Sequence, residues 1–290
     1  MRIVYHLGAH CTDEDRLVRC LLKNRALLAE HGIVVPSPTR YRRLLRDTAV
    51  QLRGAPASEE TQAVILDQIM EEASADRLIL SWENFMSFPV WVVTQSLYEH
   101  AGERLRAFTQ IFPDIEPEFH IALRNPASLL PSLQQKIAAK NPNESLRETD
   151  PLQLSWSGVV RQIIRVNPGI PVTVWCDEDA PLIWPEVLQA VSGHPDGLVL
   201  QDTGDILAQI MTEIGMNRMQ DYLAQHPPQS VAQRRRVVTA FLEKFARPEE
   251  IDLEIDMPGW DEPLVEQLGR NYQADIEEIR QMPWVRFLDA

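Results

Sequence analysis

Five short apolar runs, separated by segments with helical spacing, constrain the fold of this chain more than any other feature of its sequence. The runs are residues 2–5, 33–35, 77–81, 119–123 and 172–175. Between the first two runs, Leu17, Leu21 and Leu28 recur at the spacing of one helix face. Short buried strands that alternate with helices are typical of a parallel sheet with helices on both faces. The sequence therefore predicts an α/β fold built on a central parallel sheet of about five strands flanked by helices.

Several residues mark where the connecting helices begin and end. Residues 13–31 are expected to form one helix that Gly32 terminates, and Ser58 is placed to start another. Pro126 fits the first turn of a helix after the fourth run. In the same way, Asp150 and Pro151 are expected to open a helix that runs past Trp156.

The last third of the chain has a different pattern. After about residue 200 no further strand is expected, and amphipathic spacing predicts helices at residues 206–214, 231–245 and 264–279. We therefore expect an α/β core over residues 1–200 and a C-terminal helical extension over residues 201–290 that packs on the core.

Charge and cysteine content exclude several classes of function. The 28 basic and 42 acidic residues give a net charge of −14, which argues against non-specific binding to nucleic acid or to an anionic membrane. The three cysteines are far apart and lack metal-ligand spacing, so we expect neither a disulfide framework nor a zinc site. No apolar run approaches the ~18 residues of a membrane span, and the N-terminus has no signal-peptide pattern. We expect a cytoplasmic soluble protein.

The loop after the first strand, residues 6–15, is the first candidate site. A glycine between a first strand and a helix is where nucleotide-handling α/β proteins hold a phosphate, and Gly8 occupies that place. Three consecutive acids follow it: Asp13, Glu14 and Asp15. Carboxylates repel a phosphate, so the loop is either a modified site or an inactive one.

The residues after the strands resemble the bacterial branch of the sulfotransferases that use 3′-phosphoadenosine 5′-phosphosulfate (PAPS), over roughly residues 1–180. Members of that family begin with a strand, a His-Ile-Gly-x-x-Lys-Thr-Gly-Thr-Thr loop, and a helix that leads to a Leu-x-x-x-Gly-Ile turn. The corresponding residues here are 6–12 for the loop and Leu28, Gly32 and Ile33 for the turn. Trp156 and the run 172–175 also fall where the family pattern places them.

A second signature of the family is an arginine at a strand end with a serine eight residues later. Arg124 and Ser132 match it in residue, spacing and context, and a Ser-x-Glu after the third strand is matched by Ser81 and Glu83. The resemblance implies a P-loop sulfotransferase-like fold and PAPS, or its desulfated product PAP, as the bound nucleotide.

The resemblance also implies roles for individual residues. Arg124 and Ser132 would hold the 3′-phosphate of the nucleotide. The loop residues Gly8, Ala9, Cys11 and Thr12 would meet the 5′-phosphate, and Glu83 or His10 would act as the base toward a hydroxyl or amine acceptor. No metal ligand is implied.

The loop departs from the family pattern at two points. The family lysine, which contacts the 5′-phosphosulfate and stabilises the leaving group, is Cys11 here, and Gly-Thr-Thr becomes Asp13, Glu14 and Asp15. Losing one charge-assisted contact costs about 1.5 to 3 kcal/mol. The sequence therefore leaves two main alternatives: a sulfotransferase with a divergent donor loop, or a catalytically inactive protein of that fold that acts in binding or as a scaffold.

Simpler interpretations remain open for the same residues. Thr12 and Asp15 could form a capping box at the start of the helix, or the three acids and a histidine could surround a cation in a metal-dependent enzyme. Arg124 could pair with a carboxylate, and a histidine at a strand end is often only a hydrogen-bonded structural residue. The acceptor, any protein partner and the oligomeric state cannot be deduced from the sequence.

Overall fold

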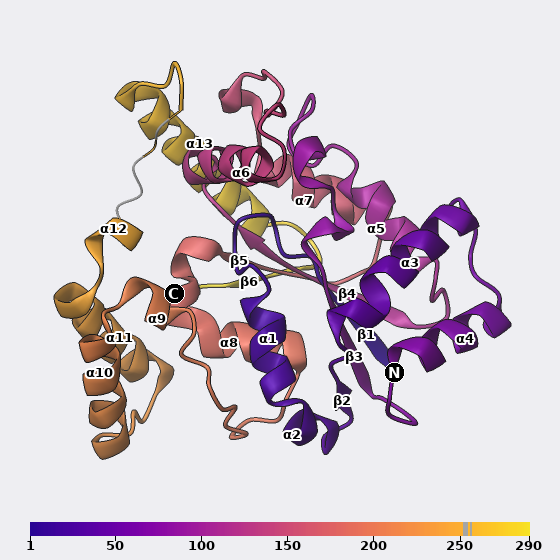
Figure 1. Ribbon diagram of the computed structural model, residues 1–290, viewed down its shortest axis with the longest axis horizontal. Helices are drawn as coiled ribbons and strands as arrows, with labels where there is room; N and C mark the ends of the chain where they lie inside the picture. The colour runs from indigo at the N-terminus through magenta and orange to yellow at the C-terminus, as the bar shows by residue number, and fades with distance from the viewer. Residues whose placement is uncertain (252–254, 256) are drawn as a thin grey trace.

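The computed structural model describes residues 1–251, 255 and 257–290 of the chain. Its centre is a six-stranded sheet in which neighbouring strands are parallel, in the order β2-β3-β1-β4-β5-β6 (Figure 1). The strands are β1 (Arg2–His6), β2 (Ile33–Val34), β3 (Arg77–Ser81), β4 (Glu116–Leu123), β5 (Val172–Cys176) and β6 (Val285–Leu288). The α/β fold with a central parallel sheet is therefore confirmed, and each predicted strand is present.

The sixth strand is not predicted from the sequence. β6 pairs in parallel with β5, from Val172 opposite Val285 to Trp175 opposite Leu288. It is four residues long, so its apolar pattern is too short to indicate a strand. The expectation that strands end near residue 200 is wrong, because the chain returns to the sheet after the C-terminal helices.

Helices cover both faces of the sheet (Figure 1). On one face lie α3 (Pro38–Leu52), α4 (Glu59–Ile69), α5 (Ala101–Thr109), α6 (Pro126–Lys140), α7 (Trp156–Val166) and α13 (Glu262–Arg280). On the other face lie α1 (Arg16–Lys23), α2 (Arg25–Ala29) and α8 (Ala180–Ser192). Side chains alternate along the buried strands, so Tyr5 packs with the first layer and Val4 with the second.

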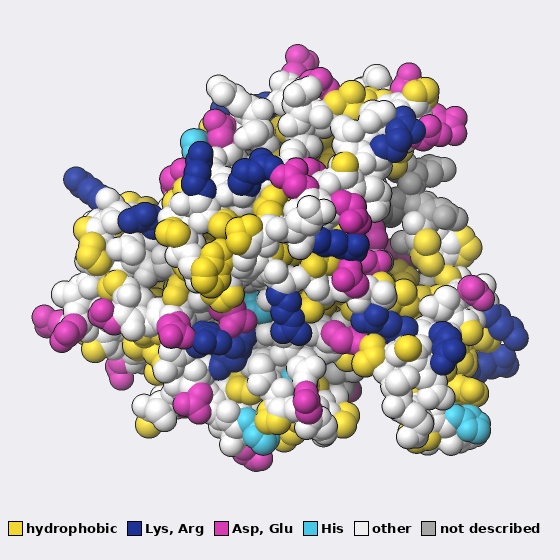
Figure 2. All heavy atoms as spheres, turned by 180° about the vertical axis from the view of Figure 1, so that it is seen from behind, with side chains coloured by type: hydrophobic (Ala, Val, Ile, Leu, Met, Phe, Trp, Pro, Cys, Tyr) yellow, Lys and Arg dark blue, Asp and Glu magenta, His cyan; other side chains and the backbone are white. Residues whose placement is uncertain are grey.

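The remaining helices form a lobe beside α8. They are α9 (Leu207–Ile210), α10 (Glu213–Gln225), α11 (Val231–Phe245) and α12 (Pro248–Ile251). The lobe has its own small apolar cluster around Met211, Met216, Met219 and Val238. A cavity of about 310 Å³, lined by residues that include Trp184, separates part of it from α8, and Figure 2 shows the lobe standing apart from the body.

The single helix expected over residues 13–31 is wrong in two respects. The helix starts only at Arg16, because Glu14 and Asp15 have φ angles of 46° and 66°, in the left-handed region that an α-helix excludes. It also breaks at Asn24, whose side chain donates to the backbone oxygen of Gln201 and accepts from its N–H. A contact with a distant segment therefore ends α1 and separates it from α2.

Two other predicted helices have different limits in the structure. Asp150 and Pro151 open only a short 3₁₀ turn, η3 (Pro151–Gln153), and α7 begins later, where Ser155 accepts from the N–H of Gly158. The segment 206–214 is interrupted at Met211, which forms an isolated bridge with Ala246. The expected helices after Ser58 and Pro126 are present as α4 and α6.

The face of the molecule in Figure 2 carries side chains of both charges. Although the net charge is −14, acidic and basic side chains are interspersed over the face in Figure 2. In the described parts of the chain, no helix has the length and apolar character needed to cross a membrane. The expectations about nucleic acid and the cytoplasm stay predictions.

Candidate functional site

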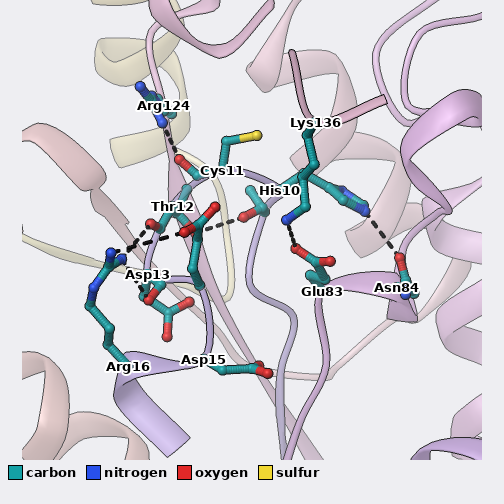
Figure 3. Close-up of polar contacts among 12 residues, drawn as sticks. His10, Cys11, Thr12, Asp13, Asp15, Arg16, Glu83, Asn84, Arg124 and Lys136 are labelled. Carbon is teal, nitrogen blue, oxygen red and sulfur yellow. Dashed lines mark hydrogen bonds and ion pairs between the residues drawn. The ribbon is translucent and has the colours of Figure 1, made fainter. Parts of the chain in front are cut away.

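The predicted site residues come together at the carboxyl edge of the sheet. Because the strands are parallel and in register, His6 lies opposite Ser81 and His120, and Leu123 lies opposite Cys176. The segments that follow β1, β3, β4 and β5 therefore meet at one edge, which is where open parallel sheets bind ligands (Figure 3).

The loop between β1 and α1 has a strongly curved backbone. Gly8 has a φ of 48°, and Cys11 has a φ of 60° although it is not glycine. The hydroxyl of Thr12 donates to the carbonyl of Ala9 at 2.6 Å and closes the turn. Thr12 is therefore not the N-cap of α1, and the expected capping box between Thr12 and Asp15 is wrong.

The acids of the loop have different surroundings, and the Asp13 and Asp15 side chains point in different directions (Figure 3). The Asp13 carboxylate is buried and accepts from the N–H of Leu17 at 2.9 Å, so it caps α1. Asp15 pairs with both terminal nitrogens of Arg42, at 2.6 and 3.0 Å, whereas Glu14 is exposed. They do not converge on one point, and the described residues contain no cluster of three or more side chains suited to a metal.

Arg124 and Ser132 lie together as the spacing predicts. The Arg124 guanidinium donates to the hydroxyls of Ser128 and Ser132, each at 3.1 Å, and to the carbonyl of Cys11. The backbone oxygen of Arg124 accepts from Trp156 Nε1 at 2.7 Å, which fixes the start of α6. Within the described ranges Arg124 has only neutral partners, so the alternative of an ion pair with a carboxylate is not seen there.

Lys136 is a site residue that the sequence reasoning missed. It follows Ser132 by one helical turn on the same face of α6, and its Nζ lies 2.5 Å from Glu83 Oε2 (Figure 3). Burial disfavours the ammonium, but the Glu83 carboxylate outweighs burial and raises the pKa of Lys136. The four-residue recurrence after Ser128 and Ser132 is the sequence signal that could have found it.

Glu83 itself lies where the Ser-x-Glu pattern places it. It begins the 3₁₀ turn η1 (Glu83–Phe85) directly after β3, and its side chain is about one quarter exposed. An ion pair with Lys136 holds its carboxylate at the site edge. Its role as base stays a prediction, and it requires this pair to open.

His10 is held on both sides of its ring. Its Nδ1 lies 2.9 Å from the Tyr98 hydroxyl and its Nε2 3.1 Å from the Asn84 side chain. Burial lowers the pKa of His10 to about 4, so the imidazole is neutral near pH 7. These contacts describe a structural histidine, and its role as base stays a prediction.

Two other titratable groups line the same edge. Burial raises the pKa of the Cys11 thiol to about 11, so it is not a thiolate at neutral pH. Burial also raises the pKa of Asp177 to about 7, and the charges of Arg124, Asp13 and Arg16 act on the same carboxyl. A carboxyl that resists ionisation therefore lies within reach of the charges of the loop and of Arg124.

These features define a class of protein: an α/β protein with a parallel sheet and a half-basic, half-acidic site at its carboxyl edge. Comparisons with protein-family models, with curated proteins and with solved structures found no match.

Proposed function

We propose that this site binds a phosphorylated nucleotide of the PAPS type and that the protein is a sulfotransferase-like transferase with a divergent donor loop. One observation carries the proposal: the Arg124 guanidinium is held by Ser128 and Ser132 and has no carboxylate partner among the described residues. The Arg124 guanidinium and the Ser132 hydroxyl form a pair of donors suited to a phosphate, whereas the Ser128 hydroxyl already donates to the carbonyl of Asn125. The 3′-phosphate of the nucleotide would take this place.

The two halves of the site suit the nucleotide differently. The half around Arg124 and Ser132 offers donors, whereas the N–H of Leu17 at the start of α1 is already taken by Asp13. A bound PAPS would supply an activated sulfuryl group. Glu83 would then accept the proton of a hydroxyl or amine acceptor, and Gly8, Ala9, Cys11 and Thr12 would surround the 5′ end.

A thermal-shift titration with adenosine 3′,5′-bisphosphate tests the binding step. We expect the nucleotide to raise the melting temperature, since a ligand that binds only the folded state stabilises it. Ser132→Ala should weaken the affinity about tenfold and Arg124→Gln about ten- to hundredfold, because each removes a charge-assisted contact. No shift at millimolar nucleotide would contradict the proposal.

Controls separate loss of binding from loss of folding. Arg124 also donates to the carbonyl of Cys11, so Arg124→Gln can loosen the loop, whereas Ser132→Ala removes only one hydroxyl. Ser192→Ala is the matched control, because it removes a buried hydroxyl at the end of α8 near the opposite edge of the sheet. It should leave the nucleotide shift unchanged.

A second candidate function is a non-catalytic binding or scaffold protein of this fold. The Asp13 carboxylate at the start of α1 favours it, since it occupies an N–H that an anion could otherwise accept from. This candidate predicts no sulfate transfer from PAPS by the native chain or by Cys11→Lys, and recovery of a partner protein by pull-down. Robust transfer by the native protein would exclude it.

A further inference from the structure

One face of α6 carries a row of polar groups toward the loop. Ser128, Ser132 and Lys136 are spaced four residues apart, and the Arg124 side chain reaches the first two. Each four-residue step along a helix rises about 6 Å. The row therefore places two cations, Arg124 and Lys136, about one to two helical turns apart.

The two cations differ in their present partners. Arg124 is bound by hydroxyls and a carbonyl, all neutral. Lys136 is held by one carboxylate, Glu83, and both side chains of this pair are roughly one quarter exposed or less. Glu83 therefore occupies the position where a second anionic group of a ligand would meet Lys136.

The loop between β1 and α1 offers few free donors for the second anionic group of a ligand. The carbonyl of Cys11 faces Arg124, and the N–H of Leu17 is taken by Asp13. Lys136 is also close enough to the buried Cys11 thiol for its charge to act on it. The loop lacks a lysine, and Lys136 brings an ammonium to the same loop from a different element.

We propose that Lys136 is the second anion-binding group of this site and that Glu83 is its internal competitor. A ligand with two anionic groups, one on Arg124 and the other about one helical turn further along α6, takes Lys136 from Glu83 and leaves that carboxylate unpaired beside the ligand. The nucleotide identity of this ligand rests on the function proposed above. The competition between Glu83 and an anion for Lys136 does not.

A double-mutant cycle on the full chain tests this competition by calorimetry. The probes are adenosine 3′,5′-bisphosphate and inorganic pyrophosphate, and the variants are Glu83→Gln, Lys136→Met and the double variant. Lys136→Met should weaken binding about ten- to hundredfold, because one charge-assisted contact is lost. Glu83→Gln should tighten it about tenfold in the native background and leave it unchanged beside Lys136→Met.

Lys140→Met is the matched control, since Lys140 lies one turn further on α6 and carries the same charge without a close carboxylate partner in the described parts of the chain. It should change affinity by less than about threefold. An equal loss in Lys140→Met, or an equal gain from Glu83→Gln in both backgrounds, would overturn the inference, because either result indicates only bulk charge. Glu83→Gln that weakens binding would overturn it as well.

The two probes separate this inference from the proposed function. If pyrophosphate binds with the expected cycle and the nucleotide does not, the inference stands and the proposed function fails. If the nucleotide binds through Arg124 and Lys136→Met leaves its affinity unchanged, the inference fails and the proposed function stands. If neither probe binds, both are wrong.

Discussion

At the scale of single residues, the Asp13 carboxylate has two opposing effects on the loop. Its carboxylate caps α1 through the N–H of Leu17 and is buried close enough to Asp177 for its charge to act on that carboxyl. The same group therefore stabilises the helix start and repels an anion. Substitutions can separate these two effects, because an amide oxygen also caps a helix but carries no charge.

Asp13→Asn and Asp13→Ala should have different effects on the free energy of unfolding but the same effect on the affinity for an anion. We expect Asp13→Ala to lower the free energy of unfolding by about 1 kcal/mol, since the cap is lost, and Asp13→Asn to lower it by less. Both should tighten pyrophosphate binding severalfold, because a buried negative charge is removed. Urea unfolding and calorimetry measure the two effects, and an unchanged affinity in Asp13→Asn would show that the carboxylate does not repel the ligand.

The sequence predicts some site residues better than others. The pairing of Arg124 with Ser132 follows from their spacing, since a strand end and the next helix fix where both lie. The path of the loop does not follow from local sequence. The left-handed conformation of Asp15 accompanies an ion pair with Arg42, which comes from another helix. Only the packed fold brings these two residues together.

At the scale of secondary-structure elements, a largely buried cluster of charged side chains links β3, β4 and α8 near the amino edge of the sheet. Arg77, the first residue of β3, donates to Glu118 of β4 at 2.6 and 3.1 Å and to the carbonyls of Ala190 and Val191 in α8. His120 lies 2.5 Å from the same carboxylate. Burial opposes ionisation of Glu118, but His120 and Arg77 outweigh it and hold its pKa at about 2.

Removing the Glu118 carboxylate should destabilise the protein strongly. Glu118→Ala leaves the largely buried Arg77 guanidinium, whose side chain is 14% exposed, without its counter-charge, which costs about 3 to 5 kcal/mol of unfolding free energy. Urea unfolding at pH 7 measures this cost. Glu116→Gln is the control. Glu116 lies on β4, as Glu118 does, and pairs with Arg2 of β1, but its side chain is 77% exposed, so we expect a loss below about 1 kcal/mol.

The same carboxylate should make stability depend on pH. The folded pKa of Glu118 is below its usual value, so its contribution is present above about pH 4.5 and is lost as the pH falls toward 2. Burial also lowers the pKa of His120, so acid weakens the folded state through both groups. Glu118→Gln should therefore lose less stability than the native protein between pH 5 and pH 2. An equal loss would show that Glu118 is not ionised in the fold.

At the scale of the whole molecule, the order of the chain explains what the sequence could predict. The strands β1 to β5 are followed by long helical segments, and their apolar runs are visible in the sequence. β6 comes after the lobe and α13, and it forms only because the edge of β5, more than 100 residues earlier, offers a partner. The division of the chain at residue 200 stays a prediction, although β6 belongs to the core sheet.

Deleting residues 281–290 should therefore destabilise the core and not merely shorten the chain. The deletion removes Phe287 and Leu288 from the apolar clusters and leaves the edge of β5 unpaired. A loss of a few kcal/mol corresponds to a melting temperature lower by roughly 5 to 10 °C for a chain of this size. The exposed edge should also promote aggregation, which light scattering would detect.

A substitution in the lobe of α9 to α12 is the comparison for the deletion of residues 281–290. Phe241→Ala on α11 weakens a cluster that contains only four buried apolar residues among those described and that borders a cavity of about 310 Å³. Hydrogen exchange should then rise in α10 and α11 while the amides of β1 and β4 stay protected, because the lobe opens without the sheet. The deletion of residues 281–290 should instead raise exchange in β5. If Phe241→Ala raises amide exchange in β1 and β4 as much as the deletion raises it in β5, the lobe and the sheet unfold together. The prediction that the lobe opens independently is then wrong.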